Sequence, residues 1–327
     1  MKGDEFMAKY DVYLTRQIPD KGLDILKKEC NLKINPKDCA PEKEEIIENI
    51  KDVDGLISLL SDPIDADVVK SNSNLKVISN YAVGYNNIDI KVANEMGVIV
   101  TNTPGILTET TADLTWALIM ATSRRIVESD KFSREGKFKG WAPKLMLGSD
   151  VYKKTLGIIG FGRIGQAVGR RALGFDMNVL YFKRNPLKEK EEKQLGAKYR
   201  DFNGLIKEAD IITINAPLND STYHMFSEKE FNLMKDTAIL INVGRGPIVD
   251  ESALLKALKN KEIMAAGLDV YEHEPEINPG LKKLDNVVLT PHTGTGTVET
   301  RDKMAIMVAE DILKSLKGET PPHIVNP

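Results

Sequence analysis

The stretch GIIGFGRIG, residues 157–165, decides the fold of this 327-residue chain. Its glycines Gly160, Gly162 and Gly165 have G-x-G-x-x-G spacing, follow an apolar run typical of a strand, and open a predicted helix near Arg163. The first glycine permits a tight turn, the second lets the backbone approach a pyrophosphate, and the third lets helix and strand pack closely. Because the amino end of the helix points at the phosphates, the stretch predicts a doubly wound sheet that binds a dinucleotide.

Strands and helices alternate on both sides of this turn. Before it, the predicted strands are DVYLTR (11–16), NLKIN (31–35), VDGLISLL (53–60), LKVISNY (75–81) and VIVTNT (98–103). From the turn onward, about six strands are predicted: TLGIIG (155–160), NVLYF (178–182), IITINA (211–216), AILINV (238–243), MAAGLDV (264–270) and NVVLT (286–290). Alternation at this pitch is typical of parallel sheets covered on both faces. We therefore expect an α/β protein with two doubly wound parallel-sheet domains.

Two long helices stand apart from this alternation. The first, over residues 108–123, is apolar on nearly every side, which is typical of a helix buried between domains or in a subunit interface. The second, over residues 297–317, has one apolar stripe and no strand after it. We expect it to pack back across the domain boundary.

Composition excludes several classes of protein. The net charge of −3 gives no sign of the basic surface that binds nucleic acid. Cys30 and Cys39 form neither a disulfide framework nor a zinc pattern, so we expect free thiols in a reducing cytoplasm. Residues 1–14 contain acids and lack the apolar run of a signal peptide. No run of about 18 uncharged apolar residues occurs, so no membrane partner is expected.

The residues after the second strand of the later series bear on the cofactor. An acid beyond Phe182 would bind the ribose hydroxyls of NAD, but Lys183, Arg184 and Asn185 follow instead. Two cations suit the 2′-phosphate of NADP. We therefore expect NADP(H) to be preferred. The alternative, that these cations only begin the charged run 183–200, leaves NAD(H) possible.

Three strand ends carry side chains suited to proton and hydride chemistry. Arg245, Glu274 and His292 each follow a predicted strand, and the carboxyl ends of parallel strands form the ligand-binding edge of such sheets. Histidine can donate a proton near neutral pH, a carboxylate can fix its ring, and a guanidinium can clamp a substrate carboxylate. Together with the glycine turn, this set favours catalysis over three unrelated surface residues.

The other histidines give no support for a metal site. His273 lies between Glu272 and Glu274, but neither H-E-x-x-H spacing nor a second histidine accompanies it. His224 follows a strand and is expected to be structural, while His323 lies near the end of the chain. We therefore expect no metal.

The order of these motifs resembles the D-2-hydroxyacid dehydrogenase family. After the glycine turn come NVGRG (242–246), DVYEHEP (269–275) and TPH (290–292). The resemblance covers essentially the whole chain. The stretches most similar to the glyoxylate/hydroxypyruvate reductase branch are ISNYAVGYNNID (78–89), TNTPGILTETTADL (101–114) and LTPHTG (289–294).

The resemblance implies roles for particular residues. His292 would be the acid–base, Glu274 its partner and Arg245 the substrate clamp. Backbone amides of Val83 and Gly84 would bind the substrate carboxylate, as an anion nest can. His292 and Arg245 would also contact the cofactor. The other implied cofactor contacts are Gly160, Phe161, Gly162, Arg163, Ile164, Gly165, Lys183, Arg184, Asn185, Val243, Gly244, Asp269 and Gly294. For Asp269 the alternative is a strand-end carboxylate satisfied within the protein.

The resemblance also implies the domain organisation. Residues 1–104 and 294–327 would form a flavodoxin-like substrate domain. Residues 105–293 would form an inserted Rossmann-type NAD(P)-binding domain. A homodimer is expected, in which Trp141 resembles a tryptophan that reaches the partner's site in some relatives; an ordinary interface aromatic is the alternative.

Some positions depart from the family pattern. Lys183 stands where many members have an acid, Thr293 replaces a common isoleucine, and Thr295 replaces a small residue. The first departure puts NAD dependence in doubt, and the other two predict an altered nicotinamide or substrate pocket.

These features lead to one expected function and two rivals. We expect a cytoplasmic enzyme that reduces small 2-keto acids, glyoxylate and hydroxypyruvate foremost, with NADPH. The first rival is an NAD-dependent dehydrogenase for a bulkier acid such as D-lactate, 2-hydroxyisocaproate or 3-phosphoglycerate. No regulatory domain is expected beyond residue 327, which disfavours phosphoglycerate. The second rival is a dinucleotide-sensing protein without turnover, which the complete set of Arg245, Glu274 and His292 disfavours.

Overall fold

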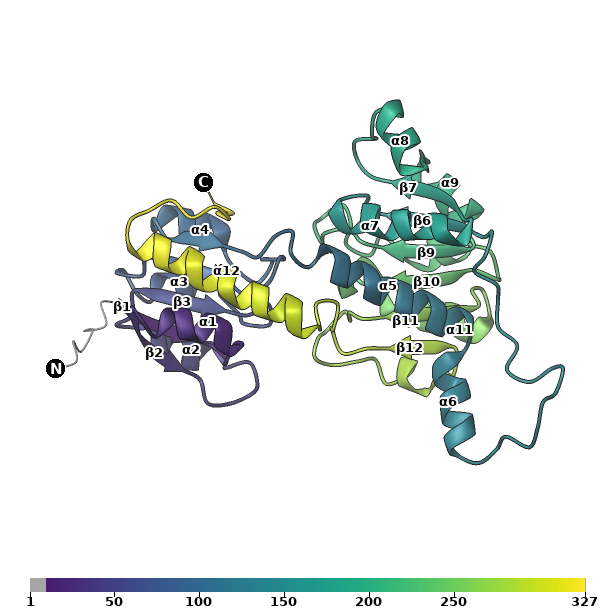
Figure 1. The fold of residues 1–327 in the computed structure, drawn as a ribbon, viewed down its shortest axis with the longest axis horizontal. Coiled ribbons are helices and arrows are strands. Elements are labelled where there is room, and N and C mark those ends of the chain that lie inside the picture. Colours follow the sequence, from purple (N-terminus) through teal and green to yellow (C-terminus); the bar gives the residue numbers. More distant parts are fainter. Residues whose placement is uncertain (1–9, 327) are drawn as a thin grey trace. The chain divides into compact units, whose positions relative to one another are not determined.

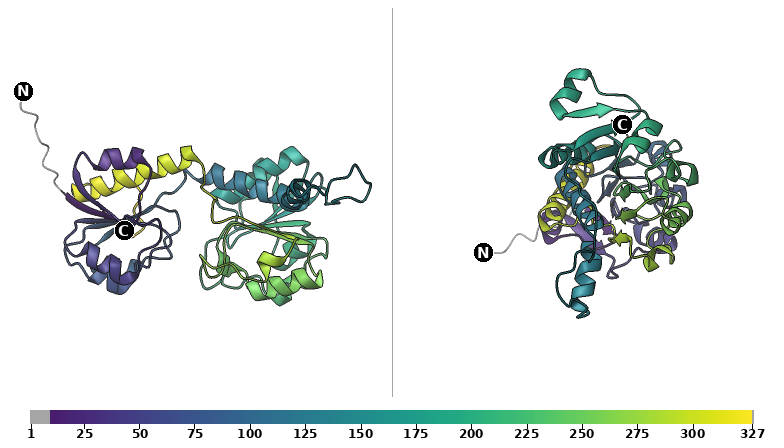
Figure 2. Two further views of the ribbon diagram at one scale, coloured as in Figure 1. Left: turned by 90° about the horizontal axis from the view of Figure 1, so that it is seen from below. Right: turned by 90° about the vertical axis from the view of Figure 1, so that its right-hand side faces the viewer.

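Two parallel sheets, each in its own unit of the chain, form the fold (Figures 1 and 2). The computed structural model describes residues 10–326. One unit contains the described residues up to Leu107 and those from Gly296 onward, and the other is Thr108–Thr295. The division expected from the sequence, after residues 104 and 293, falls near these positions. Residues 1–9, which include most of the segment searched for a signal peptide, lie outside the described part.

The first unit has five strands in the order β2-β1-β3-β4-β5, all parallel. Its strands are β1 (Tyr10–Leu14), β2 (Cys30–Ile34), β3 (Gly55–Ser58), β4 (Val77–Asn80) and β5 (Ile99–Thr101). Its helices are α1 (Asp20–Leu26), α2 (Lys43–Ile50), α3 (Ala66–Lys70), α4 (Ile90–Glu95) and α12 (Val298–Leu316). This strand order is that of flavodoxin-like sheets.

Alternate residues of these strands fill two separate cores. Val12 and Leu14 face the layer that contains α1 and α12, whereas Tyr13 faces the opposite layer. This alternation follows from the two-residue period of a strand whose two faces are both covered. Both faces of the sheet carry helices in Figure 2, so the expected parallel sheet is confirmed.

The second unit has seven parallel strands in the order β12-β11-β10-β9-β6-β7-β8. Its strands are β6 (Thr155–Ile159), β7 (Asn178–Phe182), β8 (Ala197–Tyr199), β9 (Ile211–Ile214), β10 (Ile239–Asn242), β11 (Ala265–Leu268) and β12 (Val287–Leu289). Its α-helices are α5 (Thr108–Ser123), α6 (Ile126–Arg134), α7 (Arg163–Ala172), α8 (Glu189–Leu195), α9 (Phe202–Glu208), α10 (Glu228–Phe231) and α11 (Glu251–Asn260). Short 3₁₀ turns cover Leu173–Phe175, Gly246–Ile248 and Leu281–Lys283.

The strand order of the second unit confirms the Rossmann-type fold. The first strand, β6, lies between β7 and β9, so the order reverses beside it, and ligands of such sheets bind at that reversal. The number of strands differs from the sequence prediction, which had about six. The additional strand, β8, pairs with β7 through only three residues and lies within the charged run 183–200. Its length and polar flanks gave no periodic signal.

Helices α5 and α12 pack within single units. Helix α5 packs against α7 and the strands β10, β11 and β12 of its own unit, with Glu109, Asp113 and Ala117 exposed. The sequence placed it between domains or in a subunit interface, and its contacts within this chain lie in its own unit. Helix α12 returns to the first unit, as expected, and packs on α1 and β3–β5. Within residues 10–326, no helix combines the length and apolar character that a bilayer crossing needs.

Candidate active site

The glycine turn has the geometry that a pyrophosphate site requires. Gly160 has φ of +86°, where other residues are strained, and a Cβ there would lie 2.6 Å from the nitrogen of Ala216. A Cβ on Gly165 would lie 2.2 Å from the carbonyl oxygen of Gly160, so helix α7 approaches the turn too closely for a side chain. A Cβ on Gly162 would meet no atom of residues 10–326 within 4 Å. Protein packing therefore explains the first and third glycines, and space for a ligand explains the second.

The amino end of α7 is open to an anion. Its N-cap residue is Gly162, which has no side chain to accept hydrogen bonds from the first turn, and no acid lies in that turn. Arg163 is exposed and Ile164 half-buried, while the ring of Phe161 is only 1% exposed. Of these sequence-predicted contacts, Phe161 can therefore reach a ligand through its backbone only. The residues present fit a dinucleotide pyrophosphate.

The cations of the predicted 2′-phosphate site lie beside this turn. The amide of Gly160 donates to the carbonyl of Phe182 at 2.9 Å, which joins the turn to the end of β7. Lys183 is half-buried, and Arg184 and Asn185 are exposed. Neither cation has an ion-pair partner among residues 10–326. Both charges are therefore available to a ligand.

His292 and Glu274 form a close pair. Nδ1 of His292 lies 2.7 Å from Oε2 of Glu274, and the other carboxylate oxygen accepts the amide of Tyr271 at 3.0 Å. Burial raises the pKa of Glu274, but the hydrogen bond and charge of His292, the Tyr271 amide and the charge of Arg245 outweigh it and hold that pKa below its ordinary value. Glu274 is therefore a carboxylate that fixes the orientation of the imidazole ring.

Backbone contacts hold His292 in an uncommon conformation. Its φ is +51°, a region that few residues other than glycine adopt. Its amide donates to the carbonyl of Asp269 at 2.9 Å. The Asp269 carboxylate accepts from the amides of Thr293 (2.7 Å) and Gly294 (2.8 Å), and from the hydroxyl of Thr290 (2.7 Å). Asp269 therefore organises the turn that carries His292. Its hydrogen bonds agree with the alternative considered from the sequence, a strand-end carboxylate satisfied within the protein.

Arg245 lies on the neighbouring turn of the same sheet edge. Burial lowers the pKa of its guanidinium, while the nearby Glu274 carboxylate raises it. Asn242, at the end of β10, shapes this turn because it accepts from the amide of Gly244 at 3.1 Å and donates to the carbonyl of Arg245 at 3.0 Å. Val243 is buried within the turn. The structure thus brings Arg245, Glu274 and His292 to one edge of the sheet, as the sequence predicted.

Gly246 lets the turn that carries Arg245 pack directly on the segment that leads to Glu274. A Cβ on this residue would lie 1.8 Å from the carbonyl oxygen of Tyr271, closer than any side chain permits. The backbone after Arg245 therefore packs directly on the backbone that leads to Glu274.

The first unit carries the turn predicted to hold a carboxylate. Its carbonyls point inward: Asn102 donates to the oxygen of Val83 at 2.7 Å, and Asn80 donates to that of Gly84 at 2.8 Å. The amides of Val83 and Gly84 have no acceptor within residues 10–326. This arrangement fits an anion nest.

Sequence reasoning missed the residues that shape these turns. Asn80, Asn102 and Asn242 are each single amide side chains at or just beyond strand ends, a position too common to mark a function. A second histidine–carboxylate pair was also missed, since Nε2 of His224 lies 2.6 Å from Oε1 of Glu272. Only the fold brings these residues together.

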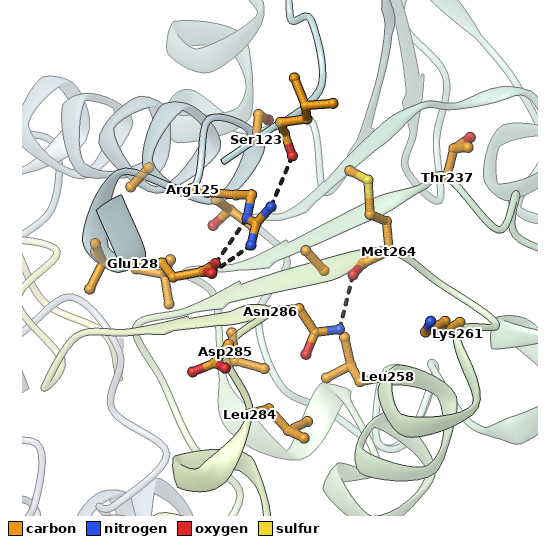
Figure 3. Close-up of a pocket in the computed structure, with 18 of the residues that line it drawn as sticks. Ser123, Arg125, Glu128, Thr237, Leu258, Lys261, Met264, Leu284, Asp285 and Asn286 are labelled. Atoms are coloured by element: carbon orange, nitrogen blue, oxygen red, sulfur yellow. Dashed lines mark hydrogen bonds and ion pairs between the residues drawn. The ribbon is translucent and has the colours of Figure 1, made fainter. Parts of the chain in front are cut away.

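A cavity of the second unit lies away from this site. It has a volume of about 990 Å³ and lies at the amino ends of β10, β11 and β12, among residues such as Thr237, Met264 and Asn286 (Figure 3). The site residues lie at the opposite, carboxyl ends of these strands. Within the described part of the chain, no three His, Cys, Asp or Glu side chains are grouped to hold a metal.

Comparisons with known proteins agree with this geometry. Residues 116–294 match the family described as D-isomer specific 2-hydroxyacid dehydrogenase, NAD binding domain. A glyoxylate reductase of Korarchaeum cryptofilum is 50% identical over 318 residues, which cover 96% of this chain and 95% of the relative. A crystal structure of a glyoxylate reductase from Paecilomyes thermophila is 34% identical with a TM-score of 0.86, and the match covers 98% of this chain and 99% of that one. An NADPH-dependent glyoxylate/hydroxypyruvate reductase from Sinorhizobium meliloti, solved with NADP and malonate, is 28% identical with a TM-score of 0.87, over 97% of each chain.

Proposed function

The chain belongs to the D-isomer specific 2-hydroxyacid dehydrogenase family, and from this membership and its site we propose that it reduces glyoxylate, and also hydroxypyruvate, with NADPH. The observation that carries the chemistry is the 2.7 Å pair of His292 and Glu274 with Arg245 beside it. Names of relatives support the substrate: two of the proteins compared above are glyoxylate reductases.

The side chains have distinct roles in this proposal. The bound dinucleotide supplies a hydride to the carbonyl carbon of the substrate. His292 gives its proton to the carbonyl oxygen, which becomes the hydroxyl of the 2-hydroxy acid. Glu274 stabilises the protonated imidazole and fixes its ring. Arg245 binds the substrate carboxylate and polarises the carbonyl, while the amides of Val83 and Gly84 bind the carboxylate as well.

We assign the cofactor by the residues that follow β7. The family's NAD-binding domain establishes a nicotinamide dinucleotide as the cofactor. Lys183 and Arg184, which have no ion-pair partner among residues 10–326, stand where an acid would select NAD, so we propose NADP(H) as the preferred form, with NAD(H) as a weaker substitute. The other dinucleotide contacts that we propose are those expected from the sequence, with Phe161 acting through its backbone and Asp269 through the turn it holds.

Steady-state oxidation of NADPH and NADH, followed at 340 nm with glyoxylate, tests this function. Hydroxypyruvate, pyruvate and 2-ketoisocaproate are assayed alongside. We expect glyoxylate to be the best substrate and kcat/KM to be at least about tenfold higher with NADPH. A faster reaction with 2-ketoisocaproate would move the protein to the dehydrogenases of bulkier acids. No turnover with any keto acid would leave a dinucleotide-binding protein.

A homodimer is part of the proposal. Large apolar side chains of the segment between α5 and β6 are exposed: Ile126, Val127, Phe138, Trp141 and Leu147. Trp141 is 85% exposed, and large exposed apolar side chains that gather in one segment are typical of subunit interfaces. Val127 and Leu147 also line the cavity at the amino ends of β10–β12. We propose that a second copy covers this face, in a protein that acts in the cytoplasm.

Light scattering during size-exclusion chromatography tests the dimer. The chain has a mass of 36.4 kDa, so a dimer elutes with twice this mass. The double variant V127E/L147E places charges in the proposed interface and is expected to give the monomer. A wild-type monomer contradicts the dimer.

A further inference from the structure

The side chain of Tyr181 connects two parts of the proposed dinucleotide site, the glycine turn and the loop that contains Lys183 and Arg184. Tyr181 lies in β7 and is fully buried. Its ring stacks on that of Phe161, with centroids 4.4 Å apart and planes at 20°. Phe161 is the residue between the first two glycines of the turn. One face of Tyr181 therefore supports the backbone proposed to bind the pyrophosphate.

The hydroxyl of Tyr181 holds the loop that contains Lys183 and Arg184. The amide of Leu187 donates to the Tyr181 hydroxyl at 2.8 Å, and the hydroxyl donates to Oε1 of Glu192 at 2.7 Å. Burial and the Glu192 hydrogen bond raise the pKa of Tyr181 to about 12, so the hydroxyl stays protonated at neutral pH. Leu187 lies near the end of the loop that contains Lys183, Arg184 and Asn185. The hydroxyl is therefore a fixed attachment point for this loop.

Few other contacts hold the loop. It begins after Phe182, whose carbonyl is bound by Gly160, and it ends at Lys188, the N-cap of α8, whose amide donates to Glu191 at 3.0 Å. Between these ends, residues 183–186 make no hydrogen bond or ion pair with residues 10–326. A free loop with long cationic side chains would lose conformational freedom on binding a phosphate. A loop attached at Leu187 loses less of it.

We propose that Tyr181 is a positioning residue for cofactor selectivity: its hydroxyl holds the loop of Lys183 and Arg184 in the geometry that binds a 2′-phosphate. Glu192, which accepts the hydrogen bond of the Tyr181 hydroxyl, has the same positioning role. Its Oε1 also accepts the amide of Tyr199 at 3.1 Å, so the acid ties the loop to β8 as well as to α8. This inference rests on the proposed preference for NADP(H). It assigns the preference to a hydroxyl that would touch no part of the cofactor.

The test measures binding rather than turnover. Isothermal titration calorimetry gives the dissociation constants of 2′,5′-ADP and 5′-AMP, which differ only by the 2′-phosphate. The variant Y181F keeps the ring on Phe161 and removes the hydroxyl alone. We expect its selectivity for 2′,5′-ADP over 5′-AMP to fall about three- to tenfold, the effect of one lost hydrogen bond, while 5′-AMP binding stays unchanged.

Two further variants complete the experiment. Y199F is the matched control, because Tyr199 packs edge-on against Tyr181 (5.7 Å) and its hydroxyl has no partner within residues 10–326. It should keep the wild-type selectivity. E192A should lower selectivity as Y181F does, whereas E192Q, which keeps an acceptor oxygen, should restore most of it.

The outcomes separate this inference from the proposed function. A selective wild type together with an equally selective Y181F overturns the role of Tyr181 alone. A Y181F variant that loses affinity for both nucleotides equally also overturns it, because the hydroxyl would then support the whole domain. A wild type that does not prefer 2′,5′-ADP overturns the NADPH preference and this inference with it.

Discussion

Nδ1 of His292 lies 2.7 Å from Oε2 of Glu274, which leaves Nε2 of the ring without a partner among residues 10–326. The carboxylate therefore occupies one ring nitrogen and leaves the other open to a ligand. In the proposed reaction, Nε2 would give its proton to the substrate carbonyl oxygen.

Replacement of His292 by alanine should remove the proton donor without disturbing the dinucleotide site. We expect kcat of H292A to fall by about 10²- to 10⁴-fold. The dissociation constant of NADPH, measured by quenching of protein fluorescence, should stay within twofold of wild type. A variant with near-normal kcat contradicts the assignment of His292 as the acid.

Acid should weaken the contribution of Glu274 to stability. The folded state holds the pKa of Glu274 below its ordinary value of 4.5, so its ionised form stabilises the protein above that value and stops doing so as the pH falls through the folded pKa. The Tm difference between wild type and E274Q should shrink as the pH falls below about 5. Thermal unfolding followed by circular dichroism between pH 7 and 3 measures this. A difference that grows in acid would mean that the pKa is raised instead.

Arg245 should be needed for its shape as well as its charge. R245A is expected to lose about 10²- to 10³-fold in kcat/KM for glyoxylate. R245K keeps a cation but cannot bind a carboxylate with two parallel hydrogen bonds, so it should recover only a small part of this loss, seen mainly as a raised KM. Full activity in R245K would mean that only the charge is required.

The second and third glycines of the turn should fail in different ways when replaced by alanine. In G162A the Cβ enters open space at a φ of −85°, so Tm should not change while the dissociation constant of NADPH rises at least about tenfold. In G165A the Cβ would lie 2.2 Å from Gly160 O, so the free energy of unfolding should fall by about 1–3 kcal/mol. Equal affinity of G162A and wild type would argue against pyrophosphate binding at this turn.

His224 should support catalysis from outside the reacting atoms. Its amide donates to the carbonyl of Pro247 at 2.8 Å, and its ring binds Glu272, whose other oxygen accepts the amide of Glu251 at 3.2 Å. This residue thereby joins the segments that carry Arg245 and Glu274. We expect H224A to lower kcat about tenfold with NADPH binding unchanged, and H224Q, which can donate from the position of Nε2, to recover most of it.

The isotope effect on hydride transfer shows whether His224 acts on the chemical step. With NADPH deuterated at C4, the kinetic isotope effect on kcat should be larger in H224A than in wild type. A lower Tm with unchanged kcat and isotope effect would limit His224 to a structural role.

Much of this protein was determined by local sequence. The spacing of Gly160, Gly162 and Gly165, the alternation of strands and helices, and the placement of Arg245, Glu274 and His292 after strands each depend on residues adjacent in the chain. In a parallel sheet, residues at carboxyl ends lie at one edge whatever the loop lengths, so the convergence of these three side chains followed from the pattern alone.

Only the tertiary structure decided which partners hold the site in place. His224 and Glu272 are 48 positions apart, and Asn102 reaches Val83 across 19. Such pairs depend on strand order and loop conformation, which no local periodicity encodes. The strand β8, three residues long, gains its place by pairing with β7 rather than by its own propensity. Likewise, the sequence placed two cations beyond β7, but the buried hydroxyl of Tyr181 that attaches their loop was visible only once the chain had folded.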